Sequence, residues 1–126
     1  MRAIVPIGRA LFALIFISCV IGQFSSPAIA AAAAHGVPLP TVLVPASGVL
    51  ALIGGVSVLL GYRARFGAFL LLVFLVPVTL VMHRFWGLSD PHVAELQRVN
   101  FLKNLALIGA ALLVMYHGAG PVSLDE

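Results

Sequence analysis

The stretch TVLVPASGVLALIGGVSVLLGY (residues 41–62) contains no Asp, Glu, Lys or Arg and is long enough to cross a lipid bilayer. It lies within a longer segment, between Arg9 and Arg63, that also lacks these residues. Two further runs, 66–83 and 104–124, are free of them as well. A soluble domain of 126 residues could not bury so much apolar surface, because a small domain leaves a large share of its chain exposed. The pattern therefore predicts an integral membrane protein.

The composition points the same way. Hydrophobic residues make up 62% of the chain and charged residues 9%, whereas soluble domains average about 45–50% and about 25%. A helix of about 20 residues crosses the hydrocarbon core, so four spans with short connections account for the chain. Since little remains for a separate soluble domain, the protein is not expected to be catalytic by itself. We predict one all-α domain over residues 1–126, a membrane-embedded antiparallel four-helix bundle with spans at about 7–24, 41–62, 66–83 and 97–117.

A short helix is predicted between the first and second spans. The alanine-rich run 28–35 follows Ser26-Pro27 and ends before Gly36, and Pro at the start with Gly after the end is typical of helix boundaries. About two turns cannot cross a membrane, so this segment is expected to be a lid or re-entrant piece. The preceding apolar run, followed by Ala28-Ile29-Ala30, also fits a cleaved signal peptide, an alternative that stays open.

The second half of the chain has a polar stretch at the expected edge of the hydrocarbon core. A span that ends near residue 116 begins near Gln97, which places Asn100, Lys103 and Asn104 at or inside this edge. Polar and ionisable groups at such depth are costly and usually face the bundle interior. Gln97, Asn100 and Asn104 share one helix face. Lys103 either points into the bundle, which we expect, or extends its ammonium to the headgroups.

Other polar residues are expected at the same side of the membrane. His83 and Arg84 end the third span with Thr79 one turn before them, while Gln23 and His35 flank the short helix. Aromatic rings such as Trp86 settle at the headgroup level. The convergence of these polar residues on the half of the bundle away from the cytoplasm predicts a binding site there for a quinone or a lipid headgroup. The predicted ligand-binding residues are His35, Thr79, His83, Arg84, Trp86, Asn100, Lys103 and Asn104.

Several function classes find no support in the sequence. The seven basic residues are scattered, whereas a nucleic-acid footprint gathers them on one face. The histidines lack a spacing typical of metal ligands, so no metal site is predicted. Cys19 is the one cysteine and is expected to behave as a small hydrophobe. No catalytic residue is proposed.

The orientation follows from the basic residues of the short loops. Arg2, Arg9, Arg63 and Arg65 lie at one end of the predicted spans, against three basic residues at the other. The richer end is expected to face the cytoplasm. Both termini of this multi-pass protein are therefore predicted to be cytoplasmic.

A series of short motifs follows in order along nearly the whole chain: Gly36 to Leu39, Gly54-Gly55, Leu59 to Arg65, Pro77 to Leu80 with His83 and Phe85-Trp86, Phe101 to Asn104, and Gly118 to Pro121 with Ser123 to Asp125. Together these motifs resemble the DoxX family of small bacterial four-helix integral membrane proteins. The resemblance implies a place in the bacterial cytoplasmic (inner) membrane. Many members carry a lysine just after the first span, where this chain has Gly22-Gln23-Phe24.

The resemblance also implies a function. It suggests an accessory or membrane-anchor subunit of a redox or quinone-linked complex, because the family is named for a subunit of a thiosulfate:quinone oxidoreductase. The alternative is a protein that binds a quinone or a lipid headgroup without a partner. No intrinsic cofactor is expected, and a quinone is the one candidate. The expected partners are membrane lipid and subunits of a membrane redox complex, with an oligomer as a further option and without nucleic acid.

Overall fold

The computed structural model describes residues 1–125, except for the side chains of residues 20 and 21. The described residues form helices and connecting segments without a strand, which confirms the all-α prediction. Within them, α3, α4 and α5 are long and apolar enough to cross a membrane, while the apolar stretch Ile4–Cys19 of α1 is shorter. The helices are α1 (Ile4–Gln23), α2 (Ser26–Ala34), α3 (Pro40–Leu60), α4 (Ala64–Met82) and α5 (Pro91–His117).

The short helix α2 occurs where the sequence predicts a helix between the first two spans. Its N-cap is Ser25, whose Oγ accepts a hydrogen bond from the N–H of Ala28 at 3.3 Å. The cap thus lies one residue earlier than the Ser26 of the predicted boundary. After His35, Gly36 adopts φ +84°, a left-handed conformation that ends the helix without a steric penalty.

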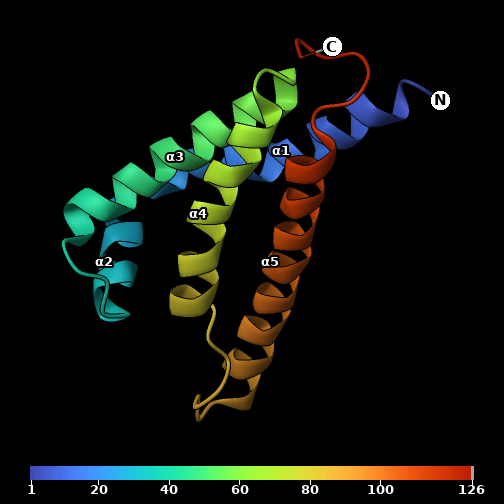
Figure 1. Cartoon of the computed structure of the whole chain (residues 1–126). Helices are drawn as coiled ribbons and strands as arrows, with labels where there is room; N and C mark the ends of the chain where they lie inside the picture. The colour runs from blue at the N-terminus through green and yellow to red at the C-terminus, as the bar shows by residue number, and fades with distance from the viewer. Residues whose placement is uncertain (126) are drawn as a thin grey trace.

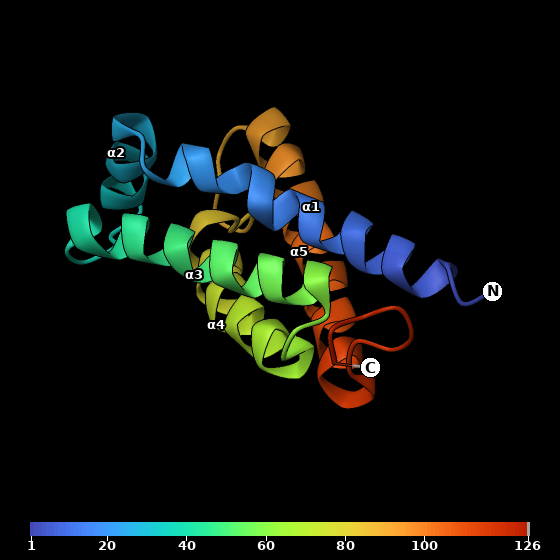
Figure 2. The same cartoon turned by 90° about the horizontal axis from the view of Figure 1, so that it is seen from above.

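The long helices form a row of neighbours. The main interfaces join α1 to α3, α3 to α4 and α4 to α5, and α2 packs on the start of α3. Figures 1 and 2 show α1 and α3 running antiparallel to each other and inclined against the pair α4 and α5. A closed bundle would also have an extensive interface between α1 and α5, which is not among the main ones. The helices therefore stack in sequence with α3 and α4 in the middle.

Two glycines allow α3 to approach both of its neighbours. A Cβ added at Gly54 would lie 2.9 Å from the carbonyl oxygen of Gly67 and from the side chain of Leu71, both on α4. A Cβ added at Gly55 would lie 3.1 Å from Ile17 of α1. Small residues let helix backbones pack closely where lipid supplies no hydrophobic driving force. The core around them consists of Phe16, Ala51, Val58, Ala68, Leu71, Phe74 and Leu75.

Large apolar side chains remain exposed along every long helix. On α5 the buried positions are Asn104 and Ala111, while residues such as Leu102, Leu112 and Leu113 are exposed. Soluble proteins rarely leave contiguous apolar surfaces of this extent in contact with water. The exposed apolar surface and the length of the helices together identify a helical membrane protein.

Candidate functional site

A cavity of about 600 Å³ lies between α2, α3 and α4. Cavities of about 300–1,000 Å³ that combine an apolar lining with a few polar groups are typical of ligand sites. The polar side chains at this cavity are Gln23, His35, Ser47 and Arg84. Its apolar wall includes Leu43, Val44, Leu50, Val73, Phe74, Pro77, Val78 and Val81.

Ser47 and Gln23 form one polar side of the cavity. The Ser47 hydroxyl lies 2.6 Å from the carbonyl oxygen of Val44 and 3.3 Å from Oε1 of Gln23. A hydroxyl has one proton, so it donates to one of these acceptors at a time. Gly48 leaves space for the Gln23 stem, because a Cβ there would lie 2.7 Å from Cβ of Gln23. The Gln23 amide N–H groups have no hydrogen-bond partner among the described residues, and they are available to a ligand.

His35 ends α2 and contributes an acceptor. Its Nδ1 lies 2.8 Å from the carbonyl oxygen of Ala31. Because a carbonyl oxygen only accepts, Nδ1 donates in this geometry and a neutral ring leaves Nε2 as an acceptor. His35 is exposed and lines the cavity. The short helix therefore brings one hydrogen-bonding atom to the edge of an apolar space.

A second acceptor comes from the backbone of α4. Pro77 lies inside this helix and has no N–H, so the carbonyl of Val73 loses its usual donor four residues later. Val73 and Pro77 both line the cavity. A carbonyl without its helical donor, in an apolar wall, favours a ligand that brings an N–H or O–H group.

A separate polar group joins α4 to α5. Nδ1 of His83 lies 2.9 Å from Oε1 of Gln97. Thr79 is 1% exposed, and its hydroxyl has no hydrogen-bond partner within the described residues. Asn104 is also buried. Trp86 lies beside these residues and packs edge-on against Phe85 and Phe101, with ring centroids 5.3 Å and 5.7 Å apart.

The predicted site residues thus divide into two groups. His35 and Arg84 line the cavity, whereas Thr79, His83 and Asn104 lie in α4 or α5 or at their ends, outside the cavity lining. Asn100 is half-buried, and Lys103 and Trp86 are exposed. Lys103 has no hydrogen bond within the described residues. Sequence reasoning missed Ser47, because Ser47, Ala51 and Gly55 recur at a spacing of four, a pattern typical of helix packing.

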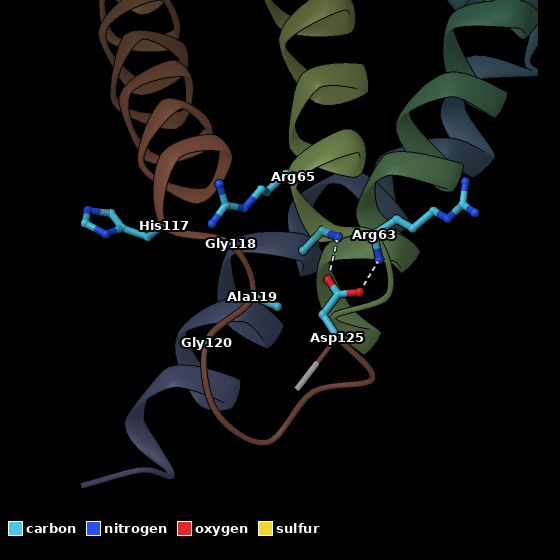
Figure 3. A pocket seen from close by; sticks show the side chains of 8 residues that line it. Arg63, Arg65, His117, Gly118, Ala119, Gly120 and Asp125 are labelled. Carbon is cyan, nitrogen blue, oxygen red and sulfur yellow. Dashed lines mark hydrogen bonds between the residues drawn. The ribbon is translucent and has the colours of Figure 1, made fainter.

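The opposite end of the molecule has a smaller cavity of about 380 Å³ beside the C-terminal segment (Figure 3). Asp125 accepts hydrogen bonds from the backbone N–H groups of Arg63 and Ala64, at 2.7 Å and 2.9 Å. These bonds hold the pKa of the Asp125 carboxyl below its usual value, and the charges of Arg9 and Arg63 add to the effect. The carboxylate therefore caps the start of α4. Arg65 extends toward Gly118, while the side chain of Arg63 points away (Figure 3).

Arg9 is buried under the C-terminal segment. It is 6% exposed, and its Nη2 donates to the carbonyl oxygen of Val122, while Nε and Nη1 have no partner in the described part of the chain. The segment also donates from Leu124 to the carbonyl of Leu60 and from Asp125 to that of Gly61, at 3.2 Å and 2.7 Å. The chain fills this end of the helices with its own hydrogen-bonding groups, so the cavity between α2, α3 and α4 is the better candidate for a ligand.

The architecture defines a helical membrane protein with an internal cavity, and comparison with known proteins gives its family. Residues 4–126 match the sequence model of the SURF4 family, so the chain belongs to this family. It is 31% identical to the ER-derived vesicles protein ERV29 of Saccharomyces cerevisiae over 78 residues, which are 62% of this chain and 25% of the yeast protein. It is 28% identical to the inner membrane protein YphA of Escherichia coli over 94 residues, 75% of this chain and 66% of that protein. The chain thus spans about a quarter of one relative and about two-thirds of the other. No solved structure matches it.

The family match shows that the resemblance to the DoxX family is wrong. It also overturns the function drawn from that resemblance, an accessory subunit of a redox or quinone-linked complex with a lone quinone or headgroup binder as the alternative. The motifs behind the resemblance are glycine turns, a helix proline and interfacial aromatic residues. Short membrane helices need these residues for the same physical reasons in different families, so their order along the chain does not distinguish one family from the other.

Proposed function

We propose that this SURF4-family protein is a membrane receptor that binds a short apolar segment of another polypeptide in the cavity between α2, α3 and α4. The observation that carries the proposal is the mixture of groups on the cavity wall. The wall is mainly apolar, yet it holds a free amide donor at Gln23 and acceptors at His35 and at the carbonyl of Val73.

A polypeptide is the ligand that matches this mixture. Each residue of a peptide brings a backbone donor and a backbone acceptor, and both need partners once they leave water. Apolar side chains of the same segment would fill the space beside Leu43 and Phe74. A plain hydrocarbon chain would fill that space too, but it would leave the Gln23 amide and the Val73 carbonyl without partners.

The proposal includes an arrangement in the membrane. α1, α3, α4 and α5 would be four antiparallel spans, while α2 is too short to cross and would cover the cavity as a lid. Both chain ends lie at the end of the molecule away from α2 (Figure 1). We place that end in the cytoplasm because it carries Arg2, Arg9, Arg63 and Arg65. The bacterial relative named as an inner membrane protein supports the same kind of membrane for this chain.

The names of the two relatives bear on the role. One is named for vesicles derived from the endoplasmic reticulum and the other for a bacterial inner membrane. A function shared by these two proteins would depend on the membrane helices themselves and not on a particular cellular compartment. Binding of a polypeptide segment by an internal cavity is such a function.

The test uses purified protein in detergent and a dansyl-labelled apolar pentapeptide as the probe. Val81 lines the cavity, whereas Val76 on the same helix is exposed and does not. Val81→Trp should fill the space and weaken probe binding about tenfold or more, and Val76→Trp should leave it unchanged. Equal binding by both variants and the unchanged protein would contradict the proposal. Equal binding of a dansyl-labelled alkyl chain of similar size would contradict the choice of a polypeptide.

A further inference from the structure

Arg84 is the one charged side chain among the residues that line the cavity between α2, α3 and α4. The remaining polar side chains there are Gln23 and Ser47, which carry no charge, and the imidazole of His35. Arg84 follows the end of α4 by two residues and is exposed, so it lies at the rim of the cavity rather than deep in it. The lining residues of the cavity therefore include one permanent positive charge, that of Arg84.

No carboxylate among residues 1–125 pairs with this charge. Within the described residues the ion pair joins Arg98 to Glu95, and these two lie on α5. Asp90 is used as the N-cap of α5, where it accepts from the N–H of His92. Asp125 caps α4 at the other end of the molecule. Every acidic side chain that the structure describes is thus engaged elsewhere, and Arg84 has no hydrogen bond within the described residues.

We propose that the polypeptide segment bound in the cavity carries a carboxylate directly after its apolar residues, and that Arg84 binds this carboxylate. The inference rests on the proposed receptor function and adds a requirement to it. The group is the C-terminal carboxylate of the partner or the side chain of an Asp or Glu. Arg84 would act as a specificity-determining residue rather than as a general binding surface.

The chemistry of the two groups accounts for the pairing. A guanidinium presents parallel N–H donors that match the two oxygens of a carboxylate, and such pairs are shorter and stronger than neutral hydrogen bonds. A carboxylate that enters an apolar cavity without a partner pays a large desolvation cost. The Arg84 charge offsets this cost at one end of the cavity and disfavours a free amino terminus there. The direction in which the segment enters is therefore set by the charge at the edge of α4.

The experiment compares two probes that differ in one group. One is a dansyl-labelled apolar pentapeptide with a free C-terminal carboxylate, and the other is the same peptide with a carboxamide. The unchanged protein should bind the acid about tenfold more tightly than the amide. In Arg84→Gln the two probes should bind within about twofold of each other. Arg84→Lys keeps the charge without the fork and should retain an intermediate preference.

The controls separate this inference from the receptor function itself. Arg98→Gln removes a basic residue that is exposed on α5 and outside the cavity, and it should keep the full preference for the acid. If the unchanged protein binds acid and amide equally while Val81→Trp still blocks both, the role of Arg84 is wrong and the receptor function stands. If neither probe binds and Val81→Trp has no effect, both are wrong.

Discussion

The two ends of α3 show opposite solutions to the same problem of unpaired polar groups. At the cavity end, where α3 begins, the amide N–H groups of Gln23 have no partner among the described residues, and the carbonyl of Val73 lacks its helical donor because of Pro77. At the basic end, where α3 finishes at Leu60, the C-terminal segment returns and bonds to the carbonyls of Leu60 and Gly61. The cavity end is surrounded mainly by apolar side chains, which offer its polar groups no hydrogen bonds. At the basic end the C-terminal segment supplies backbone N–H donors and the Asp125 carboxylate, which pair with the polar groups of the helix ends. The basic end therefore has a structural role, because its polar groups are paired within the chain. The cavity end is the candidate for binding, because some of its polar groups are not.

The largest expected effect comes from closing the space at the basic end with Gly61→Val. Gly61 has φ +68°, and a Cβ there would collide with the Arg9 guanidinium and would lie 2.2 Å from Cβ of Ser123. The left-handed backbone and the overpacking together should lower the free energy of unfolding by about 3 kcal/mol. Thermal unfolding in detergent measures this. Gly109→Val, where no atom lies within 4 Å of the added Cβ, is the matched control, and equal losses in both would show that the basic end is not tightly closed.

The corresponding change at the cavity end, Gly48→Val, should cost less. A Cβ there would lie 2.7 Å from Cβ of Gln23, so α1 and α3 must separate slightly, but Gly48 is helical and lacks the left-handed backbone strain that Gly61 adds. We expect a loss of about 1.5 kcal/mol in the free energy of unfolding. The same thermal measurement compares it with Gly61→Val. A larger loss at Gly48 than at Gly61 would reverse the comparison between the two ends.

Thr79→Val should stabilise the protein by about 1 kcal/mol. The Thr79 hydroxyl is buried without a partner among the described residues, and a methyl group in its place removes the cost of an unsatisfied donor. The gain appears as a higher midpoint of thermal unfolding. Thr41→Val, at an exposed position near the start of α3, serves as control and should have little effect. A loss of stability in Thr79→Val would mean that the hydroxyl is satisfied.

Asp125→Ala should destabilise the basic end in a pH-dependent way. Hydrogen bonds from Ala64 and Arg63 lower the pKa of Asp125 from its ordinary value of 3.8. A carboxyl whose pKa is lowered on folding adds stability that is present above the unfolded pKa and lost as the pH falls through the folded pKa. The difference in unfolding midpoint between the two proteins should therefore be constant at neutral pH and shrink below about pH 4. A difference that grows on acidification would contradict the capping role.

The smallest effect is expected for Lys103→Arg. Lys103 is exposed on α5 and bonds to nothing within the described residues. Both side chains can extend a charged group to the headgroups, so stability should change by less than about 0.5 kcal/mol. Probe binding at the cavity should be unaffected. A clear loss of binding would support the sequence-based prediction that Lys103 is a ligand residue and would extend the site from the cavity toward α5.

Much of the fold was predictable from residue type and spacing. Charge-free runs identified a membrane protein, and Pro27 and Gly36 predicted the short helix α2. The cap was displaced from Ser26 to Ser25 because both serines can accept the same kind of backbone bond, and helix boundaries shift easily by one residue. The family was not predictable from these patterns, since turns, prolines and interfacial aromatic residues serve every short membrane helix alike.

The sequence by itself predicted that Gln23, His35 and Arg84 would lie at the same end of the helices, because each ends or follows a helix, and all three line the same cavity. Only the tertiary structure decided that the cavity lies between α2, α3 and α4 rather than between α4 and α5. α1 and α3 are inclined against α4 and α5 (Figure 2), with close approaches at Gly54 and Gly55, and His83 bonds to Gln97 at the end of α4. Helix periodicity assigns a residue to a face, but the partner of that face depends on contacts between residues far apart in the chain.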